Sequence, residues 1–448
     1  MIKVLVLNGS PSGQNSITLY TVFYIQKFFP QCEFEVLDVG QRIKSYEKDF
    51  SECEAKLKEA DLILFCYPVY TFLVPSQLHR FIELIKEHGI DLGGKYATQI
   101  TTSKHFYDMT AHAFIQDNCN DLGLKYVRGL SADMEDLMKE QGQQEALSFF
   151  RYVLWSMENG FFEPVTRFVH TEDLKMPSDA EEIQGAAKAG RAVIIADLKE
   201  DSVRLRKMVE RFEKKLAMQV NLVNIEEFPF DGGCLGCFHC ASDGKCIYKD
   251  GFDDYLRNTI QTADALVYAF EIKDHSMGSR FKMFDDRQFC NGHRTVTMGK
   301  PVAYLIDGHL DEEANLKTLI EARAQVGGNY LAAVASSEHD PDRETDQAAA
   351  ALSYAYRYQY QPPKNFYGVG GLKVFRDLIY QMQGLMKADH EFYKEHGFYD
   401  FPQKQKAKIA AMYLVGSMMR NPKLSKKIGS KMAEGMIMPY KRIVDKAK

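Results

Sequence analysis

The chain has 448 residues, which is too long for one ordinary core and predicts about two to three domains at roughly 150 residues each. Hydrophobic residues make up 45% of it, and no run approaches the roughly 18 uncharged apolar residues of a membrane span. The net charge is −5, and the sequence lacks the basic patch interleaved with aromatic residues that is typical of nucleic-acid binding, so we expect no nucleic-acid partner.

The N-terminal segment MIKVLVLNGSPSG passes straight from a short apolar run into a turn. It lacks the basic region, the longer apolar region and the cleavage site of a signal peptide, so we expect a cytoplasmic protein. Thiols are kept reduced in that compartment. Clustered cysteines are therefore expected to be metal ligands or redox-active groups rather than structural disulfides.

Strand and helix patterns alternate in the first third of the chain. An apolar run at 4–10 breaks at Gly9, leads into the polar loop SPSGQNS, and is followed by apolar residues at helical spacing over 17–29. Four more strand-like runs, separated by helical patterns, lie at 32–39, 61–70, 95–103 and 124–132. This alternation predicts an α/β domain with a five-stranded parallel sheet that is covered on both faces.

The same order of elements recurs later in the chain. ADLILFCYPVYTFLVPSQLHRFIE (60–83) aligns with ADALVYAFEIKDHSMGSRFKMFDD (263–286) at an offset of 203, which indicates a tandem duplication. Upstream, 4–10 faces 193–199 at an offset of 189, so the second copy has gained about 14 residues. We therefore expect three parts: a first domain at 1–165, a second at 190–345, and a helical, basic extension at 346–448.

The loop after the first strand predicts an anion site. NGSPSGQNS directs backbone N–H groups, hydroxyls and the positive end of a helix dipole at one place, which suits a phosphate. The loop has neither the Gly-Lys-Ser/Thr ending of a nucleoside triphosphate loop nor the GxGxxG spacing of a dinucleotide fingerprint. A plain turn rich in Ser and Gly is the alternative.

LNGSPSGQNSIT (7–18), together with the segment 60–83, resembles the flavodoxin-like NAD(P)H-dependent FMN reductases. The resemblance implies two tandem flavodoxin-like three-layer domains, FMN as cofactor and NAD(P)H as co-substrate. The phosphate ligands that it implies are Ser10, Ser12, Asn15, Ser16 and Thr18. The residues that it implies around the flavin ring are Pro68, Val69, Tyr70, Thr71 and Phe72, with Thr102, Ser103 and His105 on the other side. Ser12 stands where many members carry Arg, which leaves the phosphate to dipoles rather than to a fixed cation.

The position of these loops fits their implied role, because ligands of open α/β sheets bind at the carboxyl ends of the strands. As an alternative, Tyr70 and Phe72 are aromatic residues that only cover the sheet edge. In the second copy the matching loop reads ADLKEDS, and its carboxylates Asp197, Glu200 and Asp201 would repel a phosphate. We expect no FMN on the second domain.

Four cysteines lie in one short segment of the second copy, GGCLGCFHCASDGKC (232–246). The spacing C-x2-C-x2-C-x5-C of Cys234, Cys237, Cys240 and Cys246 is closer to cubane iron–sulfur sites than to the paired hairpins of structural zinc. The segment also resembles the compact cysteine motif of the iron–sulfur flavoproteins, including the Asp253-Asp254 that follows. A [4Fe–4S] cluster is favoured, with zinc and an unoccupied or redox-active thiol loop as alternatives.

The remaining cysteines and the histidines carry no expected catalytic role. The five isolated cysteines are expected to be small buried hydrophobes: Cys32, Cys53, Cys66, Cys119 and Cys290. The scattered histidines are expected to be surface or capping residues: His105, His239, His275 and His293. We expect no protein nucleophile, because FMN would supply the chemistry.

Together these features predict an FMN-dependent oxidoreductase. Iron–sulfur flavoproteins are expected to assemble so that the cluster of one subunit lies near the flavin of another, and the duplication predicts a fused pseudo-dimer. Electrons would pass between NAD(P)H or a ferredoxin-like donor, FMN on the first domain and a [4Fe–4S] cluster on the second. The alternatives are a cluster-free flavin, quinone or nitro reductase and a non-catalytic flavin or metal electron carrier.

The partner expectations are a small-molecule or redox-protein electron acceptor and a homodimer. From 402 to 448 the chain carries ten Lys and two Arg against one Glu and one Asp, with methionines between them. This basic stretch predicts a peripheral contact with an anionic membrane surface or an acidic redox partner. The alternative is a solvated helix whose methionine side packs on the protein.

Overall fold

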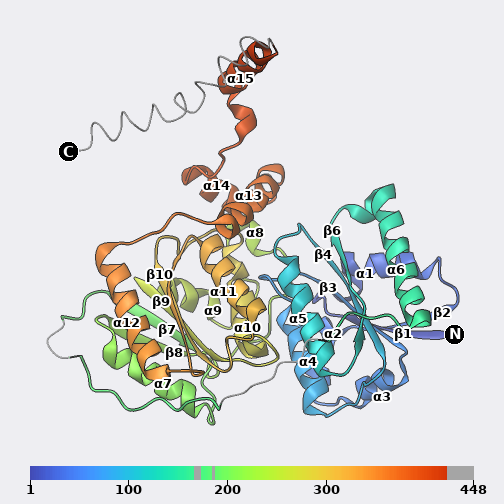
Figure 1. Cartoon of the computed structure of the whole chain (residues 1–448), viewed down its shortest axis with the longest axis horizontal. Helices are drawn as coiled ribbons and strands as arrows, with labels where there is room; N and C mark the ends of the chain where they lie inside the picture. The colour runs from blue at the N-terminus through green and yellow to red at the C-terminus, as the bar shows by residue number, and fades with distance from the viewer. Residues whose placement is uncertain (166–172, 184–186, 421–448) are drawn as a thin grey trace. The chain divides into compact units, whose positions relative to one another are not determined.

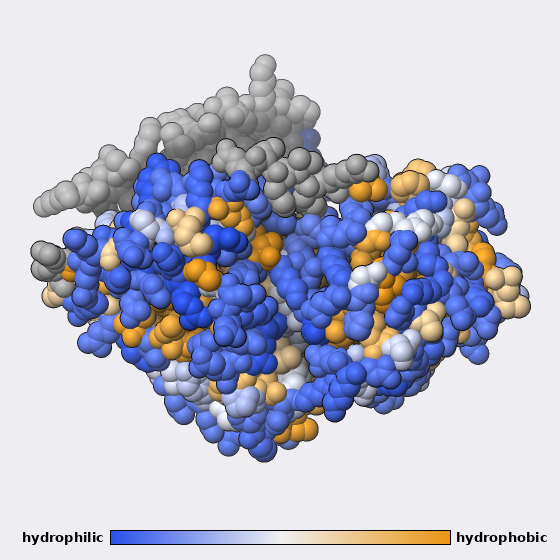
Figure 2. Space-filling view, turned by 90° about the horizontal axis from the view of Figure 1, so that it is seen from below, coloured by the Kyte–Doolittle hydropathy of each residue, from blue (hydrophilic) through white to orange (hydrophobic). Residues whose placement is uncertain are grey.

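The structure is a computed structural model that describes residues 1–165, 173–183 and 187–420 (Figure 1). Residues 1–391 form one compact unit, which contains two parallel sheets, and a second unit begins at Phe392. Hydrophilic residues cover most of the face drawn in Figure 2, and apolar residues form separate patches on it rather than one band. None of the helices in the described residues is long and apolar enough to cross a membrane.

The first sheet has the strand order β2-β1-β3-β4-β5, and all its pairs are parallel. This is the flavodoxin order, in which ligands bind where the order reverses beside β1. Its first four strands are β1 (Ile2–Asn8), β2 (Cys32–Leu37), β3 (Leu62–Pro68) and β4 (Tyr96–Ser103). The predicted fifth strand is split into two short segments that both pair with β4, namely β5 (Lys125–Tyr126) and β6 (Leu130–Asp133).

Helices cover both faces of the first sheet, as the sequence predicts. One face is covered by α1 (Ile17–Gln26) and α6 (Glu140–Asn159), and the other by α3 (Ser51–Glu59), α4 (Ser76–Glu87) and α5 (Asp108–Asp121). The remaining short helices are α2 (Val39–Tyr46), η1 (Gly13–Asn15) and η2 (Asp136–Met138).

The second sheet repeats the first, with the order β11-β10-β9-β7-β8. Its strands, all parallel, are β7 (Arg191–Ala196), β8 (Gln219–Asn224), β9 (Ala265–Glu271), β10 (Pro301–Asp307) and β11 (Tyr330–Ser336). One face is covered by α7 (Val203–Lys215) and α12 (Pro341–Tyr358), the other by α10 (Gly278–Arg287) and α11 (Ala314–Gly327). Between β8 and β10 lie the short elements α8 (Cys240–Asp243), α9 (Phe252–Tyr255), η3 (Leu256–Ile260) and η4 (Gln288–Asn291).

Equivalent backbone contacts confirm the duplication and correct its upstream register. The turn closed by Tyr70 N to Leu73 O recurs as Lys273 N to Ser276 O, at the expected offset of 203. Gly9 N donates to Cys66 O, and Asp197 N donates to Ala269 O, so Gly9 matches Asp197 at an offset of 188 rather than 189. The predicted register was one residue wrong because neighbouring apolar residues of a strand are interchangeable in a pattern, whereas strand pairing is not.

One apolar core runs through both halves of the first unit. It joins the α4 side of the first sheet to the α10 side of the second, and the matching residues Phe81 and Phe284 are both fully buried in it. Two further clusters lie beneath α1 and α6 and beneath α7 and α12. The two copies therefore meet through α4 and α10, at the faces that hold the shared core.

The predicted helical C-terminal region is confirmed for the described residues. It contains α13 (Phe366–Gln381), α14 (Lys387–Glu395), η5 (Pro402–Lys404) and α15 (Lys406–Met419). Helix α12, at the predicted boundary of 345, packs on the second sheet, and the division at 165, 190 and 345 stays a prediction. The predicted membrane contact also stays a prediction, since much of the basic stretch lies outside the described residues.

The isolated cysteines are all buried, which confirms their predicted role as small hydrophobes. The prediction for His275 was wrong, because this side chain is buried rather than at the surface. Its Nδ1 lies 2.9 Å from Glu313 Oε1 and its Nε2 lies 3.1 Å from Asp121 Oδ2. A residue of the first copy therefore helps to cover it, which no local pattern indicates.

Candidate flavin site and cysteine loop

The predicted phosphate loop joins β1 to α1 and is supported from within. Asn8 Nδ2 donates to Gly13 O at 3.0 Å and to Asp38 Oδ1 at 2.8 Å. Gly13 has a φ of +53°, a conformation that glycine adopts without strain. Ser10 and Ser16 are buried in this loop. The loop therefore has a defined conformation set by residues that lie outside it.

The start of α1 suits an anion. Its N-cap, Ser16, makes no side-chain capping hydrogen bond, and the first turn contains no acidic residue. The first N–H groups of a helix have no intrahelical partner and carry the positive end of its dipole. Ser12 is half-buried and Asn15 is exposed beside this helix end, so both can reach a phosphate there.

Thr18 and Thr102 bring the phosphate loop next to the end of β4. Their hydroxyl oxygens are 2.6 Å apart, and both side chains are buried. Ser103 is also buried, and its Oγ accepts a hydrogen bond from His105 N at 2.8 Å. His105 itself is exposed, and its ring contacts Asp108 at 3.0 Å. The predicted residues after β1 and β4 thus lie together at the carboxyl ends of these strands, and His105 is the exposed member of the group.

The loop after β3 forms a tight turn from Tyr70 to Leu73. Thr71 and Phe72 have φ values of +39° and +71°, which non-glycine residues adopt only when the surroundings hold them there. Pro68, Val69, Tyr70 and Thr71 are half-buried. Phe72 instead points into the core against the rings of Phe106 and Tyr107, at centroid distances of 5.0 and 4.5 Å. The turn therefore offers Pro68 to Thr71, more than Phe72, to a ligand.

Two residues of the second copy hold this turn, and the sequence did not single them out. Lys282 Nζ donates to Tyr70 O at 3.0 Å and to Thr71 Oγ1 at 2.6 Å. Asp286 accepts from Thr71 Oγ1 at 2.6 Å and from Ser76 N at 2.8 Å. Lys282 and Asp286 are fully buried and form an ion pair on α10. Lys and Asp four residues apart on a helix indicate an ion pair, but not that the pair is buried or that it binds the other copy.

The cysteine loop lies directly against the turn after β3. Gln77 Nε2 donates to Cys234 O at 3.1 Å, and a Cβ on Gly236 would overlap the hydroxyl oxygen of Tyr70. Gly236 also has a φ of +60°, so the close approach of the two loops depends on glycine here. Burial and then the neighbouring Cys234 raise the pKa of Tyr70 well above its usual range, so its hydroxyl is neutral.

A buried arginine holds the cysteine loop from the other side. Arg287 makes two hydrogen bonds with Asp250, at 2.7 and 2.9 Å, and donates to Gly232 O at 2.9 Å. Its guanidinium also lies 4.0 Å from Cys246 Sγ. Asp253, from the predicted Asp-Asp pair, accepts from Cys246 N at 3.0 Å. Arg287 and Asp253 therefore hold the loop on either side of Cys246.

Groups of three possible metal ligands within 4.8 Å of one another occur at two places in the described residues, and neither includes a cysteine. The preference for a cubane over zinc in the cysteine loop stays a prediction from the sequence spacing.

Burial raises the pKa of two thiols in this loop, that of Cys234 to about 12 and that of Cys240 to about 11. Cys240 Sγ donates to Phe289 O at 3.1 Å, and Cys237 is the exposed member of the set. These shifts do not separate a redox-active thiol loop from a metal centre, because both use the thiolate form.

The second copy lacks the features that suit a phosphate. Asp197 takes the position of Gly9, and its carboxylate is 8% exposed at the end of β7. Burial raises its pKa to about 6, which indicates that this place disfavours negative charge even on a side chain. A phosphate would be less favourable still, in line with our prediction of no FMN on this domain.

Comparison with known proteins agrees with the geometry of the first copy. Residues 2–117 match the model of the NADPH-dependent FMN reductase family. The chain is similar to an iron–sulfur flavoprotein of Archaeoglobus fulgidus, with 28% identity over 174 residues that cover 37% of this chain and 79% of that protein.

Solved structures also align with it. An FMN-dependent NADH-azoreductase from Bacillus anthracis in complex with FMN shares 14% identity, covers 36% of this chain and 99% of its own, and has a TM-score of 0.27. The flavoenzyme NAD(P)H:(acceptor) oxidoreductase from Paracoccus denitrificans shares 18% identity, covers 35% and 98%, and has a TM-score of 0.28.

The family match spans β1 to α5 and so includes all three predicted flavin loops. The sheet order and the start of α1 suit a phosphate at this place. By the family match, residues 2–117 of the chain are similar to the NADPH-dependent FMN reductases.

Proposed function

We propose that the chain passes electrons between FMN on its first domain and a [4Fe–4S] cluster on the cysteine loop of its second. The observation that carries this proposal is the contact between Tyr70 and Gly236, which joins the turn after β3 to the segment between Cys234 and Cys237. Short distances between redox centres are what electron transfer needs, and the two loops leave no other chain segment between them here.

When bound, FMN exchanges a hydride with NAD(P)H and single electrons with an iron–sulfur centre, which lets it couple two-electron and one-electron partners. The N–H groups at the start of α1 and the hydroxyls of Ser10, Ser16 and Thr18 would hold the phosphate. The turn from Pro68 to Thr71 would border the ring. Cys234, Cys237, Cys240 and Cys246 would hold the cluster.

The residues of the second copy contribute rigidity to this arrangement. Lys282 and Asp286 fix both sides of the turn after β3, since they bind Tyr70 O and Thr71 Oγ1 from a buried position. Supporting contacts of this kind keep a cofactor-binding loop in one geometry. The donor would be NAD(P)H or a ferredoxin-like protein, and the acceptor a small molecule or a redox protein.

The test is a visible spectrum with iron and acid-labile sulfide analysis of protein purified without oxygen. We expect a flavin spectrum on a broad iron–sulfur shoulder and about four irons per chain. Cys240→Ser should lower the iron content and change the kinetics of flavin reduction, while the buried Cys32→Ser should alter neither. The proposal fails if Cys240→Ser leaves both unchanged.

A cluster-free flavin, quinone or nitro reductase is the second candidate. The network of Arg287, Asp250 and Gly232 favours it, because these contacts hold the cysteine loop without help from the thiols. Under this alternative the purified protein gives a clean flavin spectrum without iron and still oxidises NAD(P)H with small-molecule acceptors.

A further inference from the structure

The interface between α4 and α10 contains one contact twice. Asp286 accepts a hydrogen bond from Ser76 N at 2.8 Å. At the positions offset by 203, Glu83 accepts from Ser279 N at 2.7 Å and from Ser279 Oγ at 2.7 Å. Residue i of one copy thus contacts residue j of the other, and j contacts i, as in the isologous interface of a twofold dimer.

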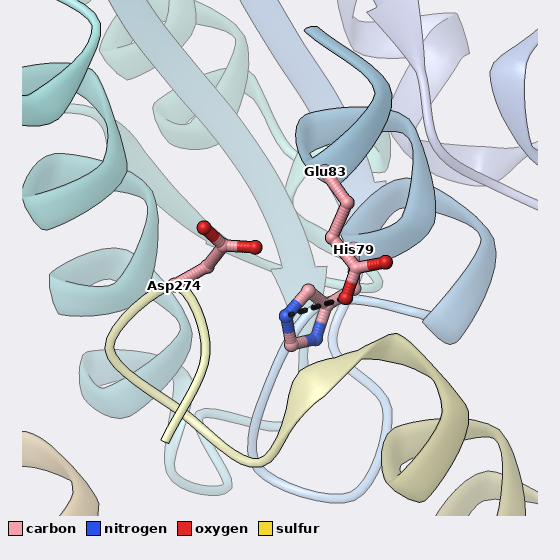
Figure 3. A group of neighbouring side chains, drawn as sticks. All are labelled: His79, Glu83 and Asp274. Atoms are coloured by element: carbon pink, nitrogen blue, oxygen red, sulfur yellow. Dashed lines mark ion pairs between the residues drawn. The ribbon is translucent and has the colours of Figure 1, made fainter. Parts of the chain in front are cut away.

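The side chains around each of these two contacts form a centre, and the two centres differ. The first centre lies beside the cysteine loop, and the second lies at the opposite end of the interface. Beside the cysteine loop, Lys282 places its ammonium group against Thr71 Oγ1 and Tyr70 O. At the opposite end, His79 takes the position of Lys282 and Asp274 takes that of Thr71. Figure 3 shows the imidazole of His79 and the carboxylates of Glu83 and Asp274 around one point, on α4 and on the turn before α10. The first centre therefore contains a cation, Lys282, whereas the second contains an additional carboxylate, Asp274.

Three buried polar atoms at this second centre make no hydrogen bond. His79 is fully buried, and neither of its ring nitrogens makes a hydrogen bond. Oδ2 of Asp274 is also buried without a partner. The ring of His79 is 4.7 Å from that of Phe114, and its Nε2 is 4.0 Å from Glu83 Oε1. Orphaned buried atoms are rare, and their convergence indicates a ligand.

The charge at this centre favours a divalent cation. Glu83 and Asp274 place two carboxylates beside the imidazole of His79. Three cations contact the outer sides of these carboxylates: Arg80, Lys86 and Lys273. Each of them also pairs with a more exposed carboxylate on its solvent side: Glu47, Glu87 or Asp121. The inner group keeps a formal charge of −2.

We propose that His79, Glu83 and Asp274 bind a first-row divalent metal ion between the two copies. One ligand atom from each lies within 4.8 Å of the others. Metal–ligand distances of about 2.0 to 2.2 Å place such atoms about 3.0 to 3.5 Å apart, so the side chains need to close by about 1 Å or a little more. His and Glu at i and i+4 face the same side of a helix, and the outer cations would orient the ligating carboxylates.

The test is a titration of the full-length, cluster-loaded protein with Mn²⁺, followed by the room-temperature EPR signal of the free ion. Mn²⁺ suits imidazole and carboxylate ligands and binds poorly to the thiolates of the cysteine loop. We expect one equivalent to be bound, with a rise in the unfolding temperature because the ion binds only the folded chain. A second, exposed group of Asp311, Glu338 and His339 is the control, and His339→Gln removes it.

Two variants copy the first centre into the second. His79→Lys supplies the ammonium group of Lys282, and Asp274→Thr supplies the hydroxyl of Thr71, so each replaces a ligand by a residue that the same fold already holds at the matching position. Each should weaken Mn²⁺ binding at least about tenfold, while His339→Gln keeps it. Equal binding by the wild type and both variants, or no binding beyond what His339→Gln removes, overturns the proposal.

Discussion

The two ends of the interface between α4 and α10 use the same positions for different chemistry. Beside the cysteine loop, Tyr70 and Phe289 meet edge to face with ring centroids 5.5 Å apart. At the other end the positions of Tyr70 and Phe289 are taken by Lys273 and Lys86, which pair with carboxylates. An aromatic contact at one end is thus matched by ion pairs at the other.

What the two ends share is the contact between a serine N–H and a carboxylate. It is made by Ser76 with Asp286 and by Ser279 with Glu83. The difference teaches that the backbone anchors of the interface were retained after duplication, while the side chains around them changed. Four positions beside the cysteine loop have a different residue at the offset of 203: Tyr70, Thr71, Lys282 and Phe289 are matched by Lys273, Asp274, His79 and Lys86.

The largest expected effect tests the buried ion pair of Lys282 and Asp286, beside the cysteine loop. Asp286→Ala leaves Lys282 as a fully buried ammonium group without its carboxylate, which should destabilise the protein by about 3 to 5 kcal/mol. The matched Glu83→Ala should cost less, because the cations around Glu83 have other carboxylate partners nearer to solvent. Urea unfolding of both variants checks this order, and equal losses would break the comparison.

The next effect concerns the approach of the two loops. Gly236→Ala places a Cβ on the Tyr70 hydroxyl at a φ of +60°, and should cost about 2 to 3 kcal/mol. Gly251→Ala is the control, since its φ is +81° but nothing lies within 4 Å of the added Cβ. FMN affinity should fall in the first variant alone. If both variants lose the same stability, the contact with Tyr70 is not tight.

A smaller effect is expected from the degenerate phosphate loop. Burial raises the folded-state pKa of Asp197 to about 6, above the ordinary value of about 3.9 in the unfolded chain. Below about pH 4 the Asp197 carboxyl is neutral in both the folded and the unfolded chain, and it costs the protein no stability. As the pH rises to about 6, the free energy of unfolding falls, because the unfolded chain ionises this carboxyl more easily than the folded protein does. Asp197→Asn should stabilise the protein by about 2 kcal/mol at pH 7 and change little at pH 4. Thermal unfolding at the two pH values checks the sign.

The smallest effect tests the anion site of the first copy. Ser12→Arg adds the cation that many family members carry at this position, and should tighten FMN binding by about 1 to 2 kcal/mol through a charge-assisted hydrogen bond. Glu200→Arg places the same residue at the matching position of the second copy and should create no FMN binding there. Titration calorimetry with both apoproteins measures the contrast.

The fold and the loops of the first copy could be predicted from the sequence because they depend on local patterns. Apolar runs, the polar loop before α1 and the turn after β3 are each continuous in the chain. The repeat at 203 extended the prediction to the second copy, and the wrong upstream register arose where an apolar strand offered no residue that distinguishes one alignment from the next.

The supporting residues could not be predicted, because their roles depend on the partner copy. A lysine on a helix is normally exposed, yet Lys282 is fully buried by the turn from Tyr70 to Leu73. Arg287 is buried for a different reason, since its partner Asp250 lies in a loop of the same copy that has no counterpart in the first. Neither burial follows from helical spacing alone, and His79 is buried for the same reason as Lys282.

The paired contact of Ser76 with Asp286 and of Ser279 with Glu83 has a consequence for how this protein could evolve. In a homodimer every substitution enters both ends of the interface, so a residue that improves one site is also imposed on its mate. A single polypeptide that carries both halves encodes each end separately. Lysine at 282 and histidine at 79 could therefore be selected independently, which a symmetric assembly of identical subunits does not allow.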